Sequence, residues 1–178
     1  MARASDHYAL ALIGVDRPGI VASITGALAG LGCNLEDVST SLLRGHFAMV
    51  LEFSAPADAA FAEIRGELLE RSAALDLHLE VWRLTDRDAR GSATHVLTVH
   101  GPDQLGILAT IAETLAARGA NIREMTCARE AGEHPTYAVT MEVEVPAAVA
   151  GPLEGELRRA AESLRLRLAL EPIEQHVL

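Results

Sequence analysis

Two segments of this sequence repeat the same residue types at the same spacing, and both could bind a small charged molecule. The candidate ligand-binding residues are Asp16, Arg17, Pro18, Gly19, Ile20, Asn34 and Leu35 in the first segment, and Asp103, Gln104, Leu105, Gly106, Ile107, Asn121 and Ile122 in the second. Where a helix begins at such a glycine, its first backbone N–H groups have no helical partner and, with the helix dipole, attract a carboxylate. Asp and Asn oxygens can accept from an ammonium group. Together these groups match a free amino acid.

A purely structural interpretation of the same segments is also open. Asp16 and Asp103 could cap the two helices by accepting hydrogen bonds from the first N–H groups. Pro18 would then lie in the first helical turn, where its missing N–H is harmless. Capping explains the glycines less well, because Gly weakens a helix by up to ~1 kcal/mol. Ligand binding and helix capping therefore stay as alternatives.

No arrangement of residues predicts catalysis or a metal site. The seven histidines are scattered, and His95 and His100 should point to opposite faces of one strand. Cys33 and Cys127 lack metal-ligand spacing, so their simplest interpretation is small buried residues in a reducing compartment. Phosphate-binding and nucleophile motifs are missing from the sequence. We expect neither an enzyme nor a cofactor.

The charge of the chain argues against direct nucleic-acid binding. Its 178 residues carry a net charge of −10 at pH 7, from 25 acidic and 15 basic side chains, whereas proteins that bind nucleic acid present a basic face to the phosphates. Hydrophobic residues make up 49% and aromatic residues only 3%, so the core should consist of Leu, Ile, Val and Ala. A signal peptide and an apolar run of roughly 20 residues are both missing, which predicts a cytoplasmic protein without membrane contact.

An internal repeat organises the whole chain. At an offset of 87 residues, three glycines, an aspartate and an asparagine of the first half match the second half: Gly14, Asp16, Gly19, Gly32 and Asn34. The charged, small-residue segment 85–93 between the copies is typical of a linker. The sequence thus predicts two domains, over residues 5–84 and 94–175.

Each copy shows the same series of hydrophobic periodicities, which predicts the order βαββαβ. Alternating apolar residues predict strands at 7–14, 34–44, 46–55 and 76–84, and again at 95–101, 121–131, 135–145 and 165–172. Helical spacing falls between the first and second strands of each copy and between the third and fourth, and Gly32 is placed to end the first helix. The expected fold class is α+β: two tandem ferredoxin-like units, each with a four-stranded antiparallel sheet and two helices on one face.

Helices on one face leave the other face of each sheet open, which predicts association. Trp82 should lie on the open face of the first sheet, where it either contacts the other repeat or another chain or is simply half exposed. Uncovered faces and exposed strand edges are liabilities unless they are paired. Closed two-fold dimers are the commonest solution, so we expect a homodimer.

Both segments resemble ACT domains, in "DRPGIVASITGALAGLGCNLEDV" and, more loosely, in "DQLGILATIAETLAARGANIREM". The tandem arrangement resembles the glycine cleavage system transcriptional repressor family. The resemblance implies amino-acid-binding regulatory modules whose ligands bind at interfaces between copies. It also implies a regulator without its own DNA-binding domain, which acts on a transcription-factor partner. The alternative is a ligand-free module that uses its sheet edges for assembly.

Overall fold

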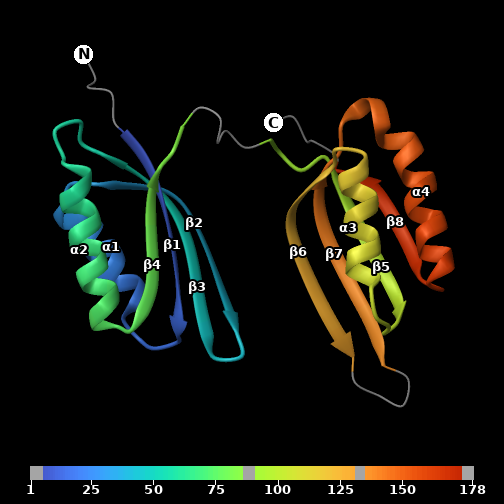
Figure 1. Cartoon of the computed structure of the whole chain (residues 1–178), viewed down its shortest axis with the longest axis horizontal. Coiled ribbons are helices and arrows are strands. Elements are labelled where there is room, and N and C mark those ends of the chain that lie inside the picture. Colours follow the sequence, from blue (N-terminus) through green and yellow to red (C-terminus); the bar gives the residue numbers. More distant parts are fainter. Residues whose placement is uncertain (1–5, 86–90, 131–134, 174–178) are drawn as a thin grey trace. The chain divides into compact units, whose positions relative to one another are not determined.

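The structure is a computed structural model that describes residues 6–85, 91–130 and 135–173. The chain divides into two compact units, residues 1–89 and 90–178, and each follows the predicted βαββαβ order (Figure 1). The first unit contains β1 (Asp6–Val15), α1 (Ile20–Gly30), β2 (Asn34–Leu43), β3 (His46–Ala55), α2 (Phe61–Ala74) and β4 (Leu77–Arg83). The second unit contains β5 (His95–Pro102), α3 (Ile107–Ala117), β6 (Asn121–Glu130), β7 (Thr136–Glu144), the short 3-10 helix η2 (Ala147–Val149), α4 (Ala150–Ser163) and β8 (Arg167–Pro172).

Each unit has one four-stranded antiparallel sheet, with strand order β2-β3-β1-β4 in the first and β6-β7-β5-β8 in the second. Two helices cover one face of each sheet, as Figure 1 shows for α1 and α2 over the first. The predicted fold class is therefore confirmed. Residues 5, 86–90, 131–134 and 174–175, which belong to the predicted domains, linker and strands, lie outside the described residues, so the predicted domain limits stay a prediction.

The core of the first unit contains more aromatic packing than its composition suggested. Tyr8 and Phe53 are among the largest fully buried side chains. The Tyr8 ring stacks on Phe53 at 5.5 Å and on Phe61 at 5.1 Å between ring centroids. The expectation of a purely aliphatic core is therefore wrong for this unit, because three of the few aromatic residues gather at one place. In the second unit the buried core is aliphatic and sulfur-containing, with Tyr137 packed against it from a half-buried position.

Close approach between strands explains one matched pair of glycines. A Cβ at Gly14 would lie 2.5 Å from Leu77 Cδ2 and 3.2 Å from the Asp76 carbonyl oxygen. In the same way, a Cβ at Gly101 would lie 2.7 Å from Leu166 Cδ2 and 3.2 Å from the Arg165 carbonyl oxygen. The strand predicted at 76–84 begins one residue later, because Asp76 has a left-handed φ of 51° and turns the chain into β4.

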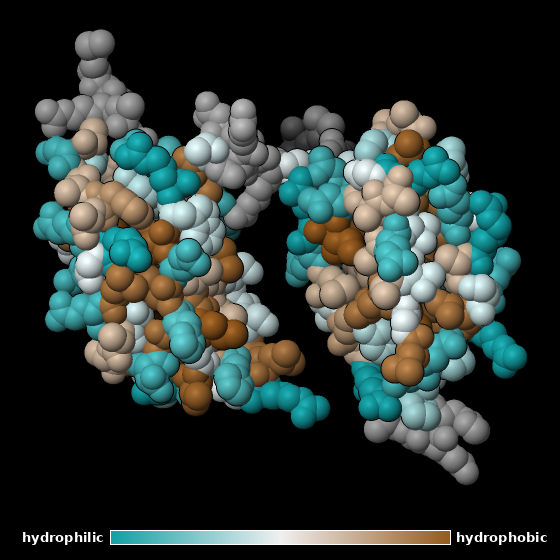
Figure 2. All heavy atoms as spheres, in the orientation of Figure 1, coloured by the Kyte–Doolittle hydropathy of each residue, from teal (hydrophilic) through white to brown (hydrophobic). Residues whose placement is uncertain are grey.

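Apolar side chains also reach the surface of the first unit, where they lie among polar ones (Figure 2). All ten residues of the edge strand β2 are exposed, including Leu35, Val38 and Leu42. The register aligns Leu35 and Val38 with buried residues of β3, and Leu42 with Phe47, which packs half-buried against the core. These three leucine and valine side chains therefore lie on the helix-covered side of the sheet. Trp82, on the opposite side, is 40% exposed. The helix layer therefore stops short of β2.

Candidate ligand-binding site

The loop between β1 and α1 contains the first group of predicted site residues. Asp16, Arg17, Pro18 and Gly19 are all exposed, and Ile20 is buried. The Asp16 N–H donates to the Gly45 carbonyl oxygen at 2.9 Å, which ties the loop to the β2–β3 turn. The helix begins when the Gly19 carbonyl oxygen accepts the Ser23 N–H at 2.8 Å.

Gly19 itself is the N-cap of α1, which corrects the capping interpretation. Its φ of 98° is left-handed, and no side-chain hydrogen bond caps the described helix. Asp16 therefore does not cap α1, and Pro18 precedes the helix instead of lying in its first turn. The physical reason is that a left-handed residue directly before the helix turns the chain sharply, so the aspartate three residues earlier lies beyond the cap position.

The N-terminus of α1 is open to solvent and to a ligand. A Cβ built on Gly19 would meet nothing within 4 Å, so the glycine is required by its backbone conformation and not by crowding. Within the described residues, no hydrogen bond or ion pair reaches the Asp16 carboxylate. Backbone N–H groups and an uncompensated carboxylate thus lie within one exposed loop.

Asn34 lies at the opposite end of the same unit. It starts β2 and aligns with Ser54, which in turn aligns with His7 at the start of β1. Nine residues of strand separate His7 from Asp16, which is about 30 Å at ~3.3 Å per residue. The helix α1 runs between the two places. Asn34 and Leu35 therefore do not join the Asp16–Ile20 loop within one unit, and the same topology separates Asn121 and Ile122 from the second loop.

The second loop has the same backbone but a different charge environment. Gly106 is again a left-handed N-cap, with φ 88°, and its carbonyl oxygen accepts the Thr110 N–H at 2.9 Å. Here the carboxylate is already paired: Arg129 Nε lies 2.7 Å from Asp103 Oδ2. The Gln104 side chain donates to the Leu164 carbonyl oxygen, and Leu105 is fully exposed. The second loop therefore presents a neutralised acid where the first presents a free one.

Three residues near the second loop were not predicted as part of a site: Arg129, Tyr137 and Cys127. Arg129 binds Asp103, and the Tyr137 pKa is raised to about 12 by a hydrogen bond with Cys127, then by burial and by the nearby thiol and Asp103. At the offset of 87 residues, Arg129 occupies the position of Leu42 in the first copy. A cation in place of a leucine is the sequence feature from which this contact could have been predicted. Tyr137 matches Phe47 only at an offset of 90, because the β6–β7 hairpin is longer than the β2–β3 hairpin.

Comparison with known families matches both units to ACT domain models, over residues 9–82 and 95–162. The chain belongs to the ACT domain family. It is 39% identical over 82 residues to the UPF0237 protein of Methanopyrus kandleri, covering 91% of that protein and 43% of this chain. It is also 35% identical over 88 residues to the glycine cleavage system transcriptional repressor of Escherichia coli, covering 49% of this chain and 46% of the repressor.

The tandem arrangement itself is found in other proteins. The chain is 27% identical over 165 residues, 91% of its length, to phosphoserine phosphatase SerB2 of Mycobacterium tuberculosis, but it spans only 40% of that enzyme. The fold matches the crystal structure of an unknown protein from Galdieria sulphuraria with a TM-score of 0.85, at 24% identity, covering 96% of this chain and all of that one. This tandem ACT-domain protein therefore shares its two-unit fold with that structure.

The described part of the tandem ACT-domain protein lacks two features that would point to other functions. No group of three or more His, Cys, Asp or Glu side chains in that part is placed to hold a metal ion. No helix in it is long and apolar enough to cross a membrane. Cys33 and Cys127 are both free thiols, the first buried and the second exposed, so the expectation of a buried residue is wrong for Cys127, which lies on the edge strand β6. Burial raises the pKa of the Cys33 thiol.

Proposed function

We propose that this tandem ACT-domain protein is an amino-acid-sensing regulator without catalytic activity, which acts on a transcription-factor partner in the cytoplasm. The observation that carries the proposal is the first loop, where the open N-terminus of α1 and the free Asp16 carboxylate lie together. The similarity to the glycine cleavage repressor supports a role in transcription. The net charge of −10 favours action through a protein over direct contact with DNA.

In the proposed complex, the ligand carboxylate accepts hydrogen bonds from the Gly19 and Ile20 N–H groups. The ligand ammonium lies near Asp16, which either binds it or orients the loop. A zwitterion satisfies both sets of groups at once, whereas a simple anion leaves the aspartate beside a like charge. An α-amino acid is therefore the expected class of ligand.

Asn34 can reach this loop only from a second copy of the chain. If two copies pair antiparallel along their β2 edges, the start of one β2 lies beside the end of the other, close to the loop that Gly45 holds. The exposed Leu35, Val38 and Leu42 on the helix side of β2 would then be covered. We propose that the complete site lies across such a pair, which agrees with a homodimer.

We further propose that the first loop binds more tightly than the second. Arg129 already neutralises Asp103, so a ligand ammonium at the second loop gains little from the carboxylate and meets a competing cation. The second loop remains a candidate site, with a weaker preference for zwitterions.

A thermal-shift screen of the common amino acids tests the proposal, because a ligand that binds only the folded chain raises its stability. We expect one class of amino acid to raise the melting temperature. For that ligand, Asn34→Ala should weaken binding about ten- to a hundred-fold by calorimetry, since the side chain is expected to bond to a charged group. Asp16→Asn should weaken it more than Asp103→Asn does. A bulky replacement of Gly19 should abolish it.

A ligand-free assembly module is the second candidate, and the exposed apolar residues of β2 are the observation that favours it. The two candidates differ in the screen. If no amino acid changes the melting temperature, while the chain associates and Val38→Glu dissociates it, assembly is the function and the loops serve only to start the helices.

A further inference from the structure

The uncovered faces of the two sheets differ in chemistry. On the first sheet, Ile13, Val15, Val50 and Trp82 are each between 40% and 54% exposed on the face away from the helices. The corresponding strands of the second sheet present mostly threonine and charged side chains, among them Thr98, Thr140, Glu142, Arg167 and Glu171. An apolar surface of this kind is typical of an interface, and the second sheet, as far as its residues are described, does not have it.

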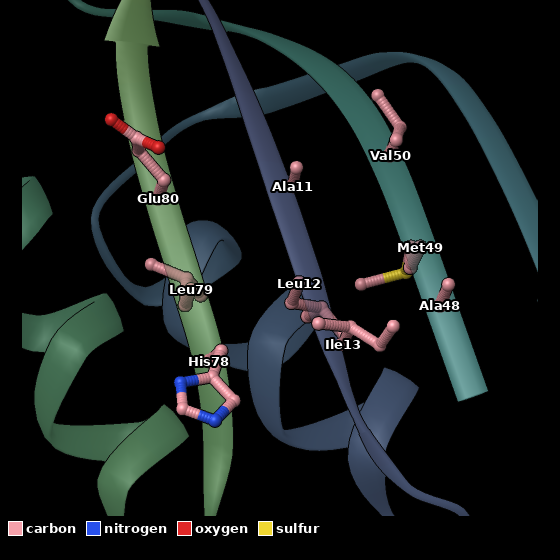
Figure 3. A pocket seen from close by; sticks show the side chains of 9 residues that line it. All are labelled: Ala11, Leu12, Ile13, Ala48, Met49, Val50, His78, Leu79 and Glu80. Atoms are coloured by element: carbon pink, nitrogen blue, oxygen red, sulfur yellow. The ribbon is translucent and has the colours of Figure 1, made fainter. Parts of the chain in front are cut away.

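Figure 3 shows the centre of this face, which we call the open face of the first sheet. Ala11 and Ile13 come from β1, Ala48 and Val50 from β3, and His78 and Glu80 from β4. The register places Val50, Ala11 and Glu80 in one row across the sheet, and Ala48, Ile13 and His78 in the next row. A shallow hollow of about 470 Å³ lies among them.

The order of side-chain sizes along β1 is self-complementary. The residues on the side away from the helices run Ala9, Ala11, Ile13, Val15, which is two small followed by two large, and Ala9 is buried among its neighbours. A two-fold axis that runs across the strands, between the Ala11 row and the Ile13 row, turns a second copy end for end on the same face. It places Ile13 over the partner copy's alanine at position 11, and Val15 over the alanine at position 9.

The same axis serves the other strands. The outward residues of β3 run His46, Ala48, Val50, Glu52. The axis therefore places His46 over the partner copy's glutamate at position 52, and Ala48 over the valine at position 50. On β4 it places His78 over Glu80. Three strands therefore show complementary pairs about one axis, which is what an interface between identical surfaces requires.

We propose that the open face of the first sheet packs face to face on the same face of a second copy. Packed sheets lie about 10 Å apart and their side chains interdigitate. Ile13 and Val50 of each copy would enter the hollow beside the small residues of the other. The interface is self-complementary in size along β1 and in the middle of β3, and in charge at the ends of β3 and on β4. It does not depend on the proposed amino-acid binding.

The second sheet does not repeat this pattern. At the positions of Ala11 and Ile13 it has Thr98 and His100, and at the position of Glu80 it has Ala169. The same rotation would place His100 over a threonine and Arg167 over an alanine. The pattern therefore belongs to the first unit and supplies a matched control on the second.

The test exchanges the large and small residues of β1. Ala11→Ile alone would place two isoleucines against each other, so it should weaken association roughly ten-fold or more. Adding Ile13→Ala exchanges the two sizes and should restore association close to that of the wild-type chain. Thr98→Ile, at the matched position of the second sheet, should have no effect. Sedimentation velocity of the full chain over a concentration series measures each, and circular dichroism checks folding.

Trp82 supplies an independent readout, because it is the single tryptophan of the chain and lies on the same face. Its fluorescence should change with protein concentration in the wild-type chain and in the exchanged double variant, but not in Ala11→Ile over the same range. Should Ala11→Ile fail to fold, Glu80→Lys weakens the same interface by placing two bases together at the His78 contact.

Three results would overturn the proposal. One is a wild-type chain that stays monomeric while Trp82 is shielded from quenchers, which would mean that this face is covered within the chain. Another is an Ala11→Ile variant that folds and associates as the wild type does. The third is an exchanged double variant that remains dissociated like Ala11→Ile, since the complementary sizes would then have no role.

Discussion

Gly19 holds a backbone conformation that other residues adopt only with strain. Its φ is 98°, and the space around it is open, so the cost of replacing it is conformational. A left-handed residue with a Cβ costs about 1–2 kcal/mol. We expect Gly19→Ala to lower the free energy of unfolding by about that amount, measured by urea denaturation with Trp82 fluorescence.

The matched control for this prediction is Gly26→Ala, within α1. Gly26 also has open space around it but has no left-handed φ, so alanine there should leave stability unchanged or raise it by up to about 1 kcal/mol. Equal stabilities of the two variants would show that the left-handed cap is not strained by a side chain.

Tyr137 gives the second loop a distinct response to high pH. Its pKa is raised from 10 to about 12, mainly by the hydrogen bond with Cys127. Between these values the unfolded chain loses a proton that the folded chain keeps. The stability contributed by this group is therefore complete below pH 10 and is lost as the pH rises toward 12. Ultraviolet absorbance titration should show a tyrosine step that moves to lower pH in Cys127→Ala.

Thr126→Ala is the control for that titration, because Thr126 neighbours Cys127 in β6 but points to the other face of the sheet. The step itself is assigned by its loss in Tyr137→Phe. If the tyrosine pKa stays high in Cys127→Ala, then burial and Asp103, and not the thiol, are the main causes of the raised pKa of Tyr137.

Among the elements, the pairing of β1 with the start of β4 depends on the absence of a side chain at Gly14. The Asp76 carbonyl oxygen, which would lie 3.2 Å from a Cβ at this position, is backbone and cannot rotate away. We expect Gly14→Ala to destabilise the first unit by about 1–3 kcal/mol, as overpacking does. Urea denaturation followed by Trp82 fluorescence measures it. Gly66→Ala, in α2 with open space around it, should not destabilise the unit.

The order of the elements could be predicted because hydrophobic periodicity indicates whether a segment is a helix or a strand and which of its faces is buried. Both copies show the same series of periodicities. Element ends were less predictable: Asp76 and Gly19 adopt left-handed conformations that spacing alone does not reveal. The candidate loops were found from Asp and Gly, but the pairing of Asp103 with Arg129 depends on register. The placement of Asn34 across α1 from the loop follows from topology and not from sequence distance.

On the scale of the whole molecule, the β2 edge and the open face of the first sheet are different surfaces. Ligand that bridges the Asp16 loop and Asn34 of a second copy should strengthen pairing at the edge, by linkage. We expect the sedimenting mass to rise when the cognate amino acid is added. In Ala11→Ile the ligand-dependent rise should persist, because that substitution lies on the other surface. A rise that Ala11→Ile abolishes would contradict this separation.

The left-handed glycines at the two helix starts also bear on how relatives of this chain are classified. Gly19 and Gly106 stand 87 residues apart with equivalent dihedral angles, while the charges around them differ. A search pattern built on Asp-x-x-Gly-Ile therefore retrieves proteins that need this turn, regardless of their ligands. The diagnostic columns are those in which the copies have diverged, such as Leu42 against Arg129. Sorting sequences by those columns would group them by the charge beside the loop, whereas sorting by the glycines groups them only by how they fold.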